Sequence, residues 1–258
     1  MLFDSLQLRE IFHLEFLRHL GRKLKPGCYA LKGGANMRFF FGSFRYSEDM
    51  DLDASGLEVS ALADTVMKIL RSSSLLDTLK PFGISDVSAP NIKKAKQTQT
   101  TQRFKIHILA SSGEDLLTKV EFSRRGFKGK IVVRPVSGSV LRAYKMPPLL
   151  VPHYDAQSAA MQKVEALALR KTVQARDIFD LYLLISRIGP GQPADIRLSK
   201  KILTSAYENI FQVSFEEFRD TVTAYLAEDD RKLYESLAIY DEIKLRAADF
   251  IGELREKK

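Results

Sequence analysis

The feature that most constrains the fold is a strict alternation of polar and apolar residues in three separate segments. In "EDMDLDA" (residues 48–54), Asp49, Asp51 and Asp53 alternate with apolar residues, and "RFKIHILA" (103–110) and "LLTKVEFSRR" (116–125) alternate likewise. Successive side chains of a strand point to opposite faces, so each segment predicts a strand with one apolar and one polar face. Together with the apolar run "KIVVRPV" (130–136), they predict one mostly antiparallel or mixed sheet that carries the aspartates on its polar face.

Helices and short connections are predicted around this sheet. Apolar residues from Leu8 to Leu20 recur at helical spacing, and Gly21 ends that pattern. Residues 35–41 and 58–71 predict two further helices, and "CYALKGG" (28–34) predicts a short strand that ends at two glycines. The polar and basic stretch "SAPNIKKAKQTQTTQ" (88–102) predicts a loop.

A change of composition predicts a second domain. After "MPPLLVP" (146–152), helix-forming residues dominate from about Asp155 to the end, interrupted by "RIGPGQPAD" (187–195). We expect an α+β fold, with a sheet-containing N-terminal domain at 1–148 and a helical C-terminal domain at 149–258.

Composition excludes several classes of function. No apolar run reaches the roughly 20 residues of a membrane span, and the charged N-terminus is unlike a signal peptide, so we expect no membrane partner and a cytoplasmic location. One cysteine, Cys28, and four scattered histidines give no disulfide or zinc pattern. A formal net charge of +8 suits an anionic partner such as nucleic acid, although it also serves solubility alone.

The order of "LKGG" and "DMDLD" indicates a chemistry for the polar face. Gly33 and Gly34 allow the backbone to approach a phosphate, and a helix that starts there directs free N–H groups at it. Asp49 and Asp51, two apart on a strand, project side by side and offer Mg²⁺ the carboxylates it takes together with substrate phosphates. From the residues alone, a tight turn followed by a solvated strand explains the same pattern.

The combination "LKGG … GSFRYSEDMDLD" resembles the signature of polymerase β-type nucleotidyltransferases, and in particular the AbiEii/AbiGii toxin family. The resemblance implies that residues 1–148 form a nucleotidyltransferase-fold domain, with a polymerase β-like sheet and flanking helices, ahead of the helical C-terminal domain. It also implies phosphate contacts from Lys32, Gly33, Gly34, Arg45 and Ser47, and a metal site at Asp49 and Asp51. The matching positions are Gly42, Arg45, Ser47, Glu48, Asp49, Asp51, Leu52 and Asp53. Ala35 stands where the family commonly has threonine, which removes a hydroxyl and leaves the phosphate to backbone amides.

Two later segments extend the resemblance. The family places a strand carboxylate beside the aspartate pair, and Glu121 in "KVEFSRR" is expected there as a catalytic residue and third metal ligand; pairing with a neighbouring lysine is the alternative. The block "MQKVEALALRKTVQARDIFDLYLL" (161–184) resembles the family's lysine helix and arginine–aspartate helix. It implies phosphate contacts from Lys163, Arg170 and Arg176, and catalytic or orienting roles for Lys163, Asp177 and Asp180. Helix capping and salt bridging explain the same charges.

The expected function is therefore transfer of a nucleoside monophosphate from an NTP to an acceptor, supported by Mg²⁺, with two ions and Glu121 completing their cage. By resemblance, the protein is the toxin of a toxin–antitoxin or phage-defence system, with tRNA as the first acceptor to test and a cognate antitoxin as partner. Two alternatives stay open, namely nucleotide transfer to a protein side chain and a basic RNA-binding module without catalysis.

Overall fold

The computed structural model describes residues 3–188 and 197–256. The segment "RIGPGQPAD" lies almost entirely outside the described residues. The chain forms two compact units, one of residues 1–40 with 46–154, and one of residues 41–45 with 155–258. We call them the sheet unit and the helical unit, and each is described by itself.

A seven-stranded mixed sheet organises the sheet unit, with strand order β3-β4-β5-β2-β1-β7-β6. The pairs β2/β5 and β1/β7 are parallel, and the other neighbours are antiparallel. The strands are β1 (Tyr29–Lys32), β2 (Asp49–Ala54), β3 (Ile84–Ser88), β4 (Thr101–Ala110), β5 (Asp115–Ser123), β6 (Ile131–Pro135) and β7 (Leu150–Tyr154). The predicted α+β class with a mixed sheet is confirmed.

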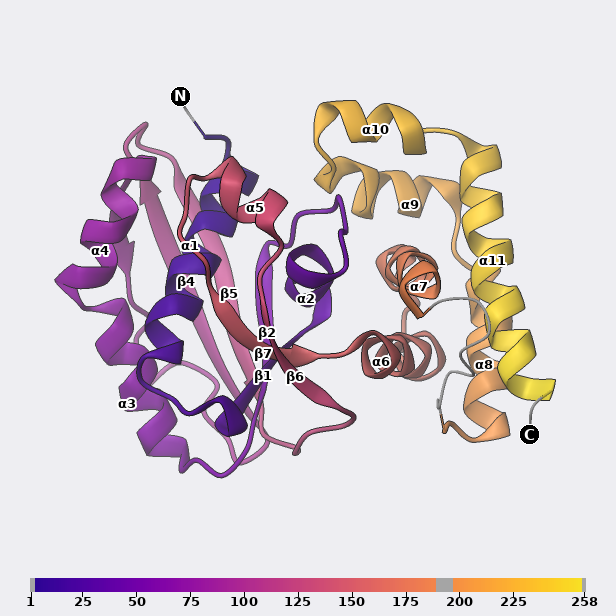
Figure 1. The fold of residues 1–258 in the computed structure, drawn as a ribbon, viewed down its shortest axis with the longest axis horizontal. Coiled ribbons are helices and arrows are strands. Elements are labelled where there is room, and N and C mark those ends of the chain that lie inside the picture. The colour runs from indigo at the N-terminus through magenta and orange to yellow at the C-terminus, as the bar shows by residue number, and fades with distance from the viewer. Residues whose placement is uncertain (1–2, 189–196, 257–258) are drawn as a thin grey trace. The chain divides into compact units, whose positions relative to one another are not determined.

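Helices α1, α3 and α4 lie together on one side of this sheet (Figure 1). The core forms there because the alternating strands direct residues such as Leu52, Phe104 and Phe122 to that side, where they are fully buried with Ile11 and Val66 of the helices. The bounds are α1 (Ser5–Gly21), α2 (Gly33–Phe40), α3 (Val59–Leu70), α4 (Ser73–Leu79) and α5 (Gly138–Ala143). The opposite side chains of the same strands therefore carry the polar residues.

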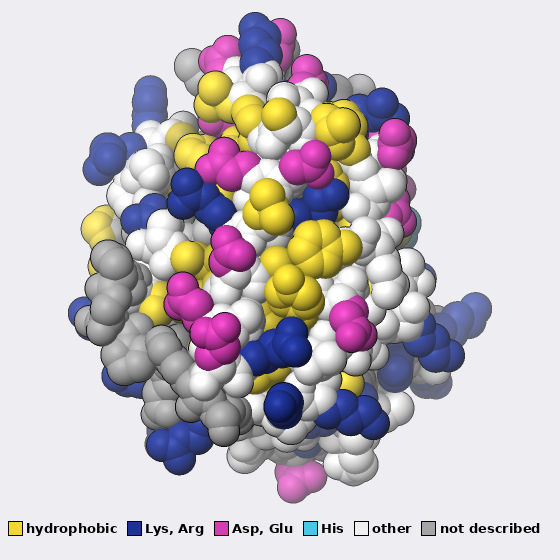
Figure 2. Space-filling view, turned by 90° about the vertical axis from the view of Figure 1, so that its right-hand side faces the viewer, with side chains coloured by type: hydrophobic (Ala, Val, Ile, Leu, Met, Phe, Trp, Pro, Cys, Tyr) yellow, Lys and Arg dark blue, Asp and Glu magenta, His cyan; other side chains and the backbone are white. Residues whose placement is uncertain are grey.

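The helical unit is built around α7 and α11. Its helices are α6 (Ala156–Leu169), α7 (Ala175–Ile188), α8 (Lys200–Ile210), α9 (Phe215–Thr221), α10 (Glu228–Tyr234) and α11 (Leu237–Glu256). Leu181 and Leu184 of α7 form a buried stripe at helical spacing, and Phe218, Tyr240 and Ile251 are buried with them in the unit. Figure 2 shows charged side chains of both signs interspersed with hydrophobic ones on one face of the molecule.

The expected domain boundary after residue 148 differs from the structure in two places. Strand β7 pairs with β1 and β6, so the sheet unit extends to Tyr154. Pro152 obscures this strand in the sequence, because proline lacks the N–H that a sheet ladder uses. Residues 41–45 belong to the helical unit, since the Arg187 Nε donates to the Phe41 carbonyl at 3.2 Å and the Arg45 guanidinium lies 3.5 Å from Asp180.

Candidate active site

Three predicted carboxylates lie on adjacent strands of the polar face. Asp51 of β2 is in register with Glu121 of β5, and Asp49 is two residues before Asp51 on the same face. Neighbouring strands are about 4.8 Å apart, so these side chains are close neighbours. The alternation in "DMDLD" and "KVEFS" produces this arrangement, because their apolar residues are committed to the core.

Two of these carboxylates form ion pairs with basic side chains at facing positions of the neighbouring strands. The Lys119 ammonium lies 2.7 Å from the Asp49 carboxylate, and the Arg103 Nε lies 2.6 Å from that of Glu121. Both partners come from the same face, since Lys119 is opposite Asp49 and Arg103 is opposite Glu121 in the strand registers. Pairing of Glu121 with a cation, the alternative raised by its sequence, therefore does occur, but with an arginine of β4.

The buried Asp53 forms a separate ion pair with the predicted phosphate ligand Lys32, whose side chain is partly exposed. The Lys32 ammonium lies 2.5 Å from one oxygen of Asp53, and the Tyr154 hydroxyl donates to the other at 2.5 Å. Burial, together with this hydrogen bond, raises the pKa of Tyr154. Asp53 is only 4% exposed, and this geometry makes it a residue that fixes Lys32 beside Asp51.

Asp51 differs from its neighbours because its carboxylate makes no hydrogen bond or ion pair with any described residue. Burial raises its pKa, Lys119 and Lys32 lower it, and Glu121 and Asp49 raise it further. Its Oδ2 lies 3.0 Å from where a Cβ on Gly33 would stand. Gly33 has a φ of +66°, so both the backbone conformation and the space favour glycine there.

The two glycines begin helix α2 directly after β1. The first N–H groups of a helix have no partner within it, so Gly33 and Gly34 present a place for an anion beside Asp51. Ala35 is buried, which shows that the position where the family has threonine faces the protein interior.

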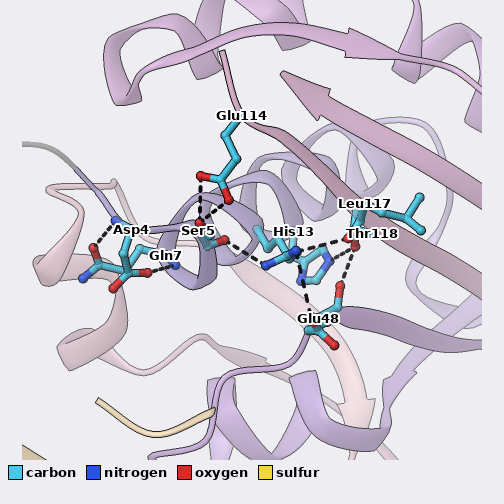
Figure 3. A network of polar contacts seen from close by, with 9 residues as sticks. Asp4, Ser5, Gln7, His13, Glu48, Glu114, Leu117 and Thr118 are labelled. Carbon is cyan, nitrogen blue, oxygen red and sulfur yellow. Dashed lines mark hydrogen bonds and ion pairs between the residues drawn. The ribbon is translucent and has the colours of Figure 1, made fainter. Parts of the chain in front are cut away.

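A hydrogen-bonded network from α1 fixes the start of β2 (Figure 3). The Thr118 hydroxyl donates to the Glu48 carbonyl at 2.6 Å, and the His13 Nε2 lies 2.8 Å from the same hydroxyl. The Thr118 hydroxyl has one proton, which it donates to the Glu48 carbonyl. The hydrogen bond between His13 and this hydroxyl therefore requires the proton of the imidazole ring to be on Nε2. Burial lowers the pKa of His13 to about 4, which keeps the ring neutral. The hydroxyl of Ser47, a predicted phosphate ligand, donates to the Asp49 carbonyl at 2.8 Å.

We expect Thr118→Val to lower the free energy of unfolding by about 2 kcal/mol, because valine has nearly the same shape but leaves two buried polar groups unpaired. Nucleotidyl transfer should fall with it, since Asp49 directly follows Glu48. Thermal melting and transfer rates of Thr118→Val and the matched Thr118→Ser, which keeps the hydroxyl, measure both effects. Equal melting of all three proteins would show that the network does not support the strand.

The second predicted block forms a buried ion cluster in the helical unit. The Lys163 ammonium lies 3.0 Å from Asp177 and 2.6 Å from Asp180, and these carboxylates are 1% and 0% exposed. Burial alone would lower the pKa of Lys163, but Asp180 and Asp177 outweigh it and raise the pKa. Burial alone would raise the pKa of Asp177, but Lys163 and Arg170 lower it. The alternative of salt bridging is thus realised for these residues.

Arginines complete this cluster from two sides. The Arg170 Nε lies 3.0 Å from Asp177, and Arg45 reaches Asp180 from the segment 41–45. Arg176 is exposed at the start of α7. Gly42 has a φ of +71°, and a Cβ atom at this position would lie only 2.7 Å from the Arg187 guanidinium. The first part of "GSFRYSEDMDLD" therefore packs in the helical unit, and its second part forms β2.

The fit of the carboxylates to a divalent cation depends on their chemistry. Within residues 3–188 and 197–256, no three histidine, cysteine, aspartate or glutamate side chains already converge on a metal position. Asp49, Asp51 and Glu121 nevertheless supply the hard oxygen donors that Mg²⁺ prefers. The half-buried Asp51, which has no hydrogen-bonding or ion-pair partner among the described residues, is the group that a cation would most stabilise, so the residues fit such an ion.

Sequence reasoning missed the residues that neutralise and support the site. The sequence predicts Arg103 only as part of a strand, whereas the antiparallel pairing of 101–110 with 115–123 is the feature that places it opposite Glu121. His13 and Tyr154 gave no signal, because nothing local connects them with the start or end of the aspartate strand.

Comparison with known protein families shows to which family the chain belongs. Residues 15–255 match the family described as nucleotidyl transferase AbiEii toxin of a type IV toxin–antitoxin (TA) system. The chain belongs to this family. The AbiEii assignment confirms the resemblance seen in the sequence and makes the protein a nucleotidyltransferase of a toxin family. No curated protein matches the chain in sequence.

Solved structures with a similar fold include proteins described as nucleotidyltransferases. MenT4, a nucleotidyltransferase toxin from Mycobacterium tuberculosis H37Rv, is 15% identical with a TM-score of 0.68, over 96% of this chain and 84% of that one. JHP933 from Helicobacter pylori is 16% identical with a TM-score of 0.58, over 100% and 96% of the two chains. A putative nucleotidyltransferase from H. pylori is 14% identical with a TM-score of 0.53, over 98% and 99%. At these identities the similarity concerns the fold.

No helix within the part of the chain that the structure describes is long and apolar enough to cross a membrane.

Proposed function

We propose that this AbiEii-family protein transfers a nucleoside monophosphate from an NTP to an RNA acceptor, with tRNA as the first candidate, and that it acts as the toxin of an antitoxin-controlled pair. The observation that carries the proposal is the unpartnered Asp51 carboxylate, placed between Gly33 on one side and Glu121 on the other. A solvated structural aspartate needs neither a phosphate-binding turn nor a second carboxylate beside it.

In the proposed reaction, the N–H groups at Gly33 and Gly34 and the ammonium of Lys32 receive the triphosphate. A hydroxyl oxygen of the acceptor forms a bond to the α-phosphorus, the bond between that phosphorus and the bridging oxygen breaks, and pyrophosphate leaves. The hydroxyl proton is released to solvent. Gly33 permits a phosphate to come close because no Cβ stands between the backbone and Asp51.

Asp49, Asp51 and Glu121 would hold the divalent cation. When bound, Mg²⁺ offsets the charge of the phosphates and of the attacking and leaving oxygens. Lys119 and Arg103 orient the carboxylates of Asp49 and Glu121 through ion pairs, while Lys32 is oriented by Asp53, which also accepts a hydrogen bond from Tyr154. Asp177 and Asp180 orient Lys163 in the helical unit, and the proposed phosphate-binding role of Lys163 is tested below.

The decisive experiment identifies the donor and the acceptor together. The protein is incubated with each of the four NTPs, labelled at the α-phosphate, and with unfractionated tRNA, total RNA or cell lysate, with Mg²⁺ or with a chelator. We expect Mg²⁺-dependent label on RNA in the tRNA size range. Label on a protein band would replace RNA by a protein acceptor, and transfer that is unchanged by the chelator would contradict the proposed ion.

A further inference from the structure

A basic pocket of about 500 Å³ lies on the sheet unit, at β4 and the loop that leads into it. This volume falls in the range of small-ligand clefts, about 300–1,000 Å³. The basic side chains that line the pocket are Lys94, Lys96, Arg103, Lys105 and the imidazole of His107.

The loop that supplies two of these lysines is attached to the sheet. The backbone N–H of Arg103 donates to the Lys96 carbonyl at 2.8 Å. Fully buried Gln102 donates through Nε2 to the side chain of Gln97 at 2.7 Å and to the Val59 carbonyl at 2.9 Å. The stretch predicted as a loop is therefore folded onto β4, and its lysines have a defined place beside the strand.

The pocket carries an excess of positive charge. Arg103 is paired with Glu121, and His107 Nδ1 lies 3.0 Å from Asp115. No ion pair within the described residues involves Lys94, Lys96 or Lys105. Uncompensated cations around a concave surface attract an anionic ligand. The face shown in Figure 2, by contrast, has charges of both signs mixed together.

The strand order places this pocket on one side of the carboxylates and the glycines on the other. The central order is β4-β5-β2-β1, so Asp51 and Glu121 lie between the pocket at β4 and Gly33 after β1. Arg103 lines the pocket and pairs with Glu121, and hence the pocket borders the carboxylate row directly. In an in-line nucleotidyl transfer, the acceptor hydroxyl approaches the α-phosphorus of the NTP from the side opposite to the leaving pyrophosphate.

We infer that this pocket binds phosphates of the acceptor RNA strand, adjacent to its reacting hydroxyl. The inference rests on the proposed function, in which the donor triphosphate occupies the glycine side and leaves the β4 side to the acceptor. A polynucleotide acceptor brings phosphates next to the reacting hydroxyl, which matches three unpaired lysines. A protein hydroxyl brings no such charge.

The test compares two triple variants of equal net charge. Lys94→Gln, Lys96→Gln and Lys105→Gln remove the unpaired pocket cations, and Lys23→Gln, Lys25→Gln and Lys68→Gln remove exposed lysines elsewhere in the sheet unit. Binding of unfractionated tRNA is measured without NTP over a range of salt, and transfer is measured with varied tRNA and varied NTP. For the pocket variant we expect affinity for tRNA to fall on the order of tenfold near physiological salt. Its salt slope should fall by about 2 to 3.

The KM for NTP should be unchanged in both triple variants, and the control variant should retain most of the salt slope. Equal tRNA binding by the pocket and control variants would overturn the inference while leaving nucleotidyl transfer intact. Loss of NTP affinity in the pocket variant would assign the pocket to the donor instead. A wild-type protein that transfers nothing would defeat the proposed function, and the binding comparison, which needs no turnover, would still decide whether the pocket binds RNA.

Discussion

Replacing Asp51 with asparagine should abolish nucleotidyl transfer and leave the sheet unit folded. Asparagine keeps the shape of the side chain but removes the charge that a divalent cation needs, and loss of one such charged group costs on the order of a thousandfold in rate. Stability should be equal or slightly higher at neutral pH, because burial and the neighbouring carboxylates raise the pKa of Asp51 and so oppose its charge.

The raised pKa of Asp51 also fixes the direction in which the stability difference between wild type and Asp51→Asn changes with pH. A carboxyl whose pKa is raised by folding destabilises the native state where it is ionised, and this cost disappears as the pH falls through the folded pKa. Wild type should therefore gain stability relative to Asp51→Asn on acidification. Thermal melting without metal, transfer with metal and growth on expression are the measurements, with exposed Asp64→Asn as the control.

Two outcomes for Asp51→Asn would contradict the proposed site. Full transfer by the folded variant would remove Asp51 from the chemistry, and early melting would make it a structural aspartate of the strand. If the family's toxicity operates through this reaction, expression of wild type should slow growth and expression of Asp51→Asn should not.

Replacing Lys163 with methionine should lower the free energy of unfolding by about 3 to 5 kcal/mol, because two carboxylates stay buried after their shared cation is removed. Methionine has similar length and no charge. The exposed neighbour Lys171→Met serves as the control and should melt close to wild type. Chemical denaturation of the three proteins measures the difference.

The pH dependence of this loss follows from the directions of the two pKa shifts. The pKa of Lys163 is raised, so its contribution is complete below the ordinary value of 10.5 and is lost as the pH rises through the folded value. The pKa of Asp177 is lowered, so its contribution is present above the ordinary value of 3.8 and is lost as the pH falls through the folded value. The penalty should be constant between these limits and shrink below pH 3.8.

A double variant separates the two possible roles of Lys163. In Lys163→Met with Asp177→Asn, Asp180 keeps its ion pair with Arg45, and the exposed Arg170 is solvated when it loses Asp177, so much of the stability should return. If transfer stays lost in this restored protein while Asp177→Asn alone still transfers, Lys163 serves the nucleotide. Recovery of both stability and transfer would limit Lys163 to holding the helices together.

The sequence predicts which strands alternate and which face each side chain takes, but it does not predict which residues of the neighbouring strands pair with the carboxylates. The "DMDLD" pattern placed Asp49 and Asp51 on one face because period-two spacing is a local property. The cations at Lys119 and Arg103 depend on strand order and register, which are set by distant pairing. The resemblance placed Glu121 beside Asp51, and the register of β2 and β5 shows them as neighbours.

The same limit applies to the boundaries between units. Pro152 made β7 look like a connection, and residues 41–45 looked like part of one continuous signature with β2. Only the contacts of Phe41 and Arg45 with α7 reveal that these five residues pack elsewhere. Local sequence patterns contain no record of such long-range contacts.

The assignment of residues 41–45 to the helical unit means that the chain passes between the two units three times, at positions 40/41, 45/46 and 154/155. Cutting the gene once after Tyr154 therefore yields no complete helical unit, since Arg187 and Asp180 would lose partners that remain on the other fragment. A chimera that exchanges the helical unit between family members has to carry these five residues along with the C-terminal helices. Recombination at a single point would instead combine one protein's 41–45 with another's α7, which favours joint inheritance of the two segments.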